Sequence, residues 1–93
     1  MPVRLHRYLG EPKDFARATV LQLITYYRWH WWWIRYRRGR FDCSPFYSRV
    51  RLLEVHLEAR SVDPELIKCM RDYYAADRFD MLPARLRAFY AGL

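Results

Sequence analysis

The stretch DFARATVLQLITYYRWHWWWIRYRR, from Asp14 to Arg38, decides the fold of this chain. Pro12 lies just before it with acidic neighbours, which is typical of a first helical turn. Gly39 follows it and arginines fill its last turn, as at many helix C-termini. These end signals predict one long helix over 14–38, with residues 1–12 forming an N-terminal arm.

The same stretch has an alternative interpretation as a pair of strands. Residues 28–31 read Arg-Trp-His-Trp, an alternation that is typical of a β-strand. A hairpin would need a turn, and residues 16–38 contain no glycine, proline, asparagine or aspartate to make one. The helix is therefore the preferred prediction.

The rest of the chain predicts shorter helices. Ser44 as N-cap and a proline after it indicate a helix to about Arg60. Asp63 and the following proline indicate another to about residue 76, and a last one begins near Pro83 and runs to Tyr90. The expected fold is all-α: a single domain over 1–93, built as a bundle of three or four helices around the aromatic-rich first one.

Positive charge is concentrated at one end of the sequence. The 93 residues hold 17 basic and 10 acidic side chains, a net charge of +7. Residues 1–40 contain nine basic and two acidic side chains, whereas 41–93 contain eight of each. The excess excludes an acidic mimic of nucleic acid and favours an anionic partner.

The candidate binding residues lie at the densest part of this charge. On a helical wheel, Trp32 falls on the polar face of the first helix, between Arg28 and Arg35, a spacing that allows guanidinium–indole stacking. The predicted site consists of Arg28, Trp32, Arg35, Arg37, Arg38 and Arg40. In the alternative interpretation, Trp32 belongs to the core and the arginines only complement the helix dipole.

Motifs for catalysis, metal binding or cofactor binding are missing from the sequence. The three histidines are scattered, and Cys43 and Cys69 form neither a zinc motif nor a disulfide framework. Three glycines in all leave no phosphate-binding loop. We therefore expect no enzyme, no metal and no cofactor.

These features predict a non-enzymatic binding protein that presents a basic, aromatic surface to an anionic macromolecule, most simply nucleic acid. The alternative is a small protein–protein interaction module or inhibitor that docks on an acidic partner; its size alone suggests an accessory factor of a phage or mobile element. A weaker third reading is an amphipathic membrane-surface role.

Apolar residues cover about two-thirds of the first helix, where a surface helix usually shows one stripe. This surplus suggests a homodimer through that helix. The sequence shows no secretory signal, and Val20–Ile34 is too polar to span a membrane, so we expect a cytoplasmic protein with reduced thiols.

Overall fold

The computed structural model describes residues 12–37, 43–76 and 82–93, and the side chains of 15–36, 43–76 and 82–93. The elements are the 3-10 helix η1 (Pro12–Arg17) and the α-helices α2 (Val20–Arg37), α3 (Ser44–Ala59), α4 (Pro64–Ala75) and α5 (Ala84–Ala91). These ranges contain no strand, so the all-α prediction is confirmed and the strand alternative is wrong. The N-terminal arm lies outside the described residues, except that Pro12 begins η1.

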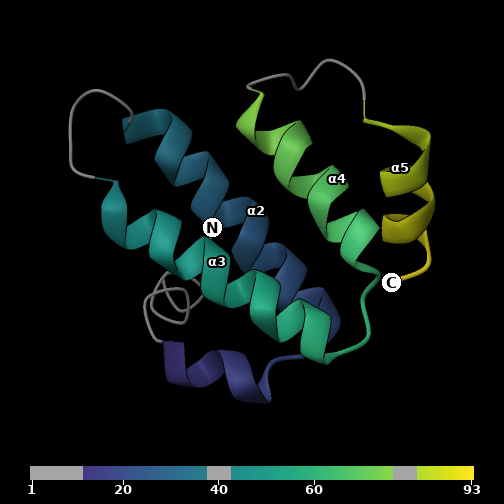
Figure 1. The fold of residues 1–93 in the computed structure, drawn as a ribbon, viewed down its shortest axis with the longest axis horizontal. Helices are drawn as coiled ribbons and strands as arrows, with labels where there is room; N and C mark the ends of the chain where they lie inside the picture. Colours follow the sequence, from purple (N-terminus) through teal and green to yellow (C-terminus); the bar gives the residue numbers. More distant parts are fainter. Residues whose placement is uncertain (1–11, 38–42, 77–81) are drawn as a thin grey trace.

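α2 is the helix around which the others are arranged. Figure 1 shows it running between α3 and α4 and partly behind α3, while η1 lies below α3 and α5 packs on α4. One cluster of buried side chains joins all five elements. None of the described helices is both long and apolar enough to cross a membrane.

The long helix begins later than the sequence predicts. Thr19 Oγ1 accepts a hydrogen bond from the Gln22 amide at 3.1 Å, and Gln22 Oε1 accepts one from the Thr19 amide at 2.9 Å. This reciprocal pair is a capping box, which satisfies two amides that have no partner inside the helix. The predicted start at residue 14 is wrong, because this cap opens a separate helix after a break at Ala18 and Thr19.

The break places Phe15 in the core. Its side chain is fully buried and lies edge-on to His30 of α2 and His56 of α3. Arg60 Nη2, just after α3, donates to the Ala16 carbonyl at 2.8 Å and so holds η1 in place. In one continuous helix, Phe15 would lie about four turns from His30 along the axis of α2 and could not contact it.

The starts of the other helices, predicted from local capping residues, agree with the structure to within about one residue. Asp63 caps α4, with its side chain accepting from the Glu65 amide at 3.0 Å, as predicted. At α3, however, the N-cap is Cys43 and makes no side-chain cap bond, so Ser44 is the first helical residue. The predicted Ser44 cap is therefore wrong by one position. Pro83 precedes α5, as expected.

α3 ends in a Schellman motif that has serine in the position usually taken by glycine. Ser61 has φ 66°, a left-handed conformation in which L-residues are strained. Its amide donates to the Glu58 carbonyl at 3.0 Å, and the Val62 amide donates to the Leu57 carbonyl at 3.1 Å. Val62 and Leu57 are both buried, so the turn directs the chain from α3 into α4 along the core.

Tyr27 joins three helices. Its ring is fully buried and its hydroxyl donates to Glu54 Oε2 on α3 at 2.7 Å. Arg71 of α4 donates to the same carboxylate through Nε, at 3.1 Å to Oε2, and through Nη2, at 2.9 Å to Oε1. Burial and the hydrogen bond to Glu54 raise the pKa of Tyr27 far above its ordinary value.

Replacing Thr19 with alanine removes the hydroxyl that caps α2 and should lower the free energy of unfolding by about 1 kcal/mol. Urea unfolding followed by far-UV circular dichroism measures the change. Thr25→Ala is the matched control, because the Thr25 hydroxyl donates only to the Leu21 carbonyl within the helix, at 2.9 Å. Alanine is the better helix former there, so the control should be neutral or slightly stabilising. Equal losses in the two variants would contradict the capping role.

The buried tyrosine predicts a loss of stability in alkali. Unfolded Tyr27 loses its proton above its ordinary pKa of 10.0, whereas folded Tyr27 keeps it. Its contribution to stability is therefore complete below about pH 10 and falls as the pH rises. Urea unfolding at several pH values between about 10 and 12 gives the free energy of unfolding as a function of pH. This free energy should fall less steeply in Tyr27→Phe than in the unaltered protein, by up to about 1.4 kcal/mol per pH unit. The difference between the two proteins at neutral pH gives the pH-independent loss of stability caused by the substitution, which is subtracted. Equal pH dependence of the free energy of unfolding in the two proteins would contradict the prediction.

Candidate functional site

Four aromatic side chains form a cluster on one side of α2, which we call the aromatic stack: Trp29, Trp32, Trp33 and Tyr36. The rings of Trp29 and Trp32 are stacked, with centroids 5.5 Å apart and planes 11° from parallel. Trp32 and Tyr36 are stacked in the same way, at 5.4 Å and 10°. Trp33 lies edge-on to Trp32, with centroids 5.1 Å apart. The result is a column of three rings with a fourth ring closing its side.

The spacing of these residues explains the column. Residues three and four positions apart are neighbours on a helix surface, and the four rings follow at i, i+3, i+4 and i+7. Each aromatic pair of this geometry contributes about 0.5–1.5 kcal/mol beyond its buried area. The column is therefore a property of α2 alone and needs no partner from another helix.

Trp32 and Tyr36 are the exposed members of the aromatic stack. Trp32 is 48% exposed and Tyr36 is 60% exposed, whereas Trp29 and Trp33 are half-buried. The alternative in which Trp32 belongs to the core is wrong. The indole that joins the core is its neighbour Trp31, which is 6% exposed and packs edge-on against Tyr47 of α3.

The charged side chains of α2 are all basic, since its 18 residues include three arginines and no acid. Arg28 and Arg35 are exposed and stand seven residues apart, on one side of the helix. The Arg28 guanidinium lies over the ring of Tyr90 of α5, 5.4 Å from its centroid. Both faces of Trp32 are occupied by Trp29 and Tyr36, instead of by the arginines that the sequence suggested.

The structure thus brings together part of the predicted site. Arg28, Trp32 and Arg35 share the exposed side of α2, and Arg37 is its last residue. The predicted contacts Arg38 and Arg40 lie outside the described residues. Trp29, Trp33 and Tyr36 were missed as site residues, although their i, i+3, i+4, i+7 spacing with Trp32 was a signal that could have found them.

Two groups of the kind that can take part in catalysis, the Glu54 carboxylate and the Cys43 thiol, have hydrogen-bond partners within the fold. Glu54 accepts from Tyr27 and is paired with Arg71. The Cys43 thiol lies 3.9 Å from the Ile34 carbonyl. Within the described ranges, no three histidine, cysteine or acidic side chains gather as a metal site would require.

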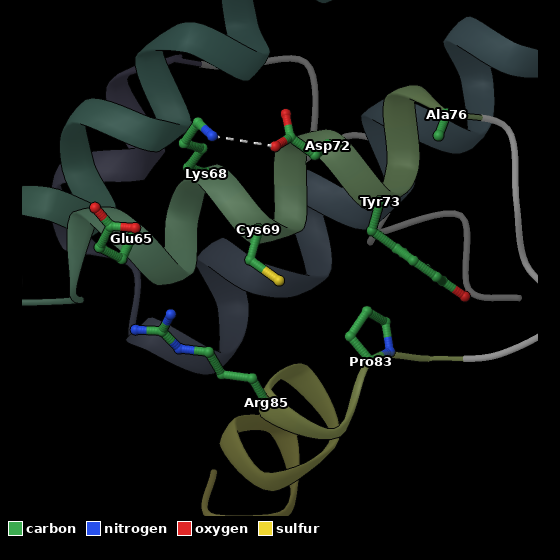
Figure 2. Close-up of a pocket in the computed structure, with 8 residues that line it drawn as sticks. All are labelled: Glu65, Lys68, Cys69, Asp72, Tyr73, Ala76, Pro83 and Arg85. Atoms are coloured by element: carbon green, nitrogen blue, oxygen red, sulfur yellow. Dashed lines mark ion pairs between the residues drawn. The ribbon is translucent and has the colours of Figure 1, made fainter.

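A cavity of about 600 Å³ lies between α4 and α5. Figure 2 shows the Cys69 thiol directed toward the space beside Pro83, with Lys68 paired to Asp72 at 3.6 Å. Arg85, at its rim, donates to Asp63 at 3.0 Å. Both signs of charge meet around this cavity and are largely paired with each other, so it has no single electrostatic preference.

No protein-family model, curated protein or solved structure matches this chain. The geometry of α2 and its neighbours is therefore what bears on the function of this protein.

The two neighbouring tryptophans should respond differently to truncation. Trp32→Ala removes stacking on a surface and should lower the free energy of unfolding by about 1–2 kcal/mol. Trp31→Ala empties part of the core and should cost about 3–5 kcal/mol. Urea unfolding of both variants measures the difference, and a larger loss for Trp32 would contradict the exposed position of that ring.

Proposed function

We propose that the protein is a non-enzymatic binding protein that holds single-stranded nucleic acid against the aromatic stack of α2. One observation carries the proposal: Trp32 and Tyr36 stack in an exposed position on a helix whose charged side chains are all arginine. Proteins that bind single strands combine rings that stack on bases with cations that follow the phosphates. Both components occur here on one helix.

Tyr36 is the ring that is best placed to receive a base. Trp29 and Tyr36 already cover the two faces of Trp32, so a base could stack there only by separating rings that stabilise each other. Tyr36 ends the column and is the more exposed ring. A base on the outer face of Tyr36 extends the column without breaking it, while Trp32 supports Tyr36 from behind.

Arg28 and Arg35 supply the phosphate contacts in this proposal. Seven residues of helix separate them by about 10 Å along the axis, so they can contact different phosphates of one strand. Arginine pairs bidentately with phosphate oxygens, and the charged side chains of α2 are all arginines. These contacts give affinity without base specificity.

The stack favours a single strand over a duplex. Bases inside a duplex have both faces covered by their neighbours, whereas a single strand can turn a base out onto an aromatic ring. We expect tighter binding to a single-stranded oligonucleotide than to its duplex at the same salt concentration.

Fluorescence anisotropy of a labelled single-stranded oligonucleotide tests the stacking contact. Tyr36→Ala should weaken binding by about 5- to 150-fold, which corresponds to the 1–3 kcal/mol of one stacked base. Tyr47→Ala is the matched control, because Tyr47 is an exposed tyrosine on α3, outside the aromatic stack. Its affinity should stay unchanged.

The same titration at several salt concentrations tests the charges. Arg35→Gln should reduce the slope of log affinity against log salt by about 0.7, the value for one phosphate contact on a single strand. Arg51→Gln, an exposed arginine of α3, is the control and should keep the slope.

An absence of binding at low salt would overturn the proposal. Equal effects of the Tyr36 and Tyr47 variants would overturn the assignment to the aromatic stack. In the first case an acidic protein surface, the alternative partner for an exposed basic and aromatic face, becomes the class to test.

A further inference from the structure

A groove of about 550 Å³ lies beside the aromatic stack, between α2 and α4. Trp29 and Trp32 line it from α2, and Tyr73 and Tyr74 line it from α4. Its volume is within the range of about 300–1,000 Å³ that is usual for sites of small ligands. Four aromatic rings on two helices suit a flat, unsaturated group.

Arg28 is the one charged side chain among the described residues that line this groove. Its guanidinium lies over the Tyr90 ring, and the Tyr90 hydroxyl is 2.9 Å from the hydroxyl of Tyr74. Burial raises the pKa of both tyrosines, so both phenols stay neutral at physiological pH. Among the described residues of this lining, no negative charge therefore opposes an anion at Arg28.

The groove and the aromatic stack share two walls. Trp29 and Trp32 line the groove and also form the inner part of the column that ends at Tyr36. Trp29 and Tyr36 are seven positions apart, which is about 10 Å along the helix axis, so a strand of a few nucleotides reaches both ends.

We propose that this groove receives one nucleotide of the bound strand, with its base against Tyr73, Trp29 and the edge of Trp32, which leaves the aromatic stack intact, and with its phosphate on Arg28. The inference rests on the proposed function and adds a second subsite, the groove, to the platform at Tyr36. The occupant is a nucleotide because the described part of the lining combines aromatic walls with one cation, the complement of a base that carries a phosphate.

Adenosine 5′-monophosphate is the probe, because it fits a single subsite and does not span both. Titration followed by tryptophan fluorescence and by NMR shifts of the aromatic side chains should show saturable binding. Arg28→Gln should weaken it roughly 10- to 100-fold, the loss of one charge-assisted contact to the phosphate. Adenosine, which lacks the phosphate, should bind the unaltered protein with a similar loss.

Further variants separate the groove from surfaces outside it. Tyr73→Leu should weaken binding of the mononucleotide, whereas Tyr47→Ala and Arg51→Gln on α3, outside both the groove and the aromatic stack, should leave it unchanged. Arg28 and Arg51 are both exposed, so the matched pair Arg28→Gln and Arg51→Gln reports binding even if Tyr73→Leu fails to fold.

The outcomes distinguish this inference from the proposed function. Mononucleotide binding that is absent, that is equally weakened by Arg28→Gln and Arg51→Gln, or that is unchanged in a folded Tyr73→Leu variant overturns the proposal for the groove. Oligonucleotide binding that depends on Tyr36 would still support the platform. Loss of oligonucleotide binding altogether overturns the proposed function, and the assignment of the groove to a strand fails with it, even if the mononucleotide binds.

Discussion

The rotation of α2 about its own axis is the constraint on which the rest of the structure depends, and Tyr27 sets it. The buried ring, with its hydroxyl on Glu54 and Arg71 on the same carboxylate, ties α2 to α3 and α4 at one register. A helix advances by about 100° per residue, so the position nine residues later faces almost directly away. That position is Tyr36. Fixing Tyr27 in the core therefore fixes Tyr36 in solvent.

The aromatic content of α2 is divided by this rotation. Tyr27 and Trp31 join the core, where removal of large rings from water stabilises a small domain. Trp32 and Tyr36 remain on the surface, where they cover each other and are still exposed to solvent. In the proposed function, the positions of these rings are already set before a ligand binds, which reduces the entropy lost on binding.

Local physics made much of the fold predictable. The Asp63 cap and the proline after it act within one turn, so the start of α4 could be placed to the residue. The start of α2 was missed because two local signals competed: Pro12 and its acidic neighbours indicated a helix, and Thr19 with Gln22 indicated a later one. In the structure, which has the later start, Phe15 contacts His30 and His56, two residues that are distant from it in sequence.

The sequence by itself determined the all-α class, the helical ends that rest on local caps, and the concentration of positive charge before residue 41. Each depends on neighbouring residues or on composition alone. Only the tertiary structure decided that Trp31 is buried and Trp32 exposed, and that α4 forms a groove against Trp29 and Arg28. The physical reason is that both outcomes follow from the way α3 and α4 pack on α2. On a helix that is apolar around most of its circumference, the local pattern does not say which side those neighbours will cover.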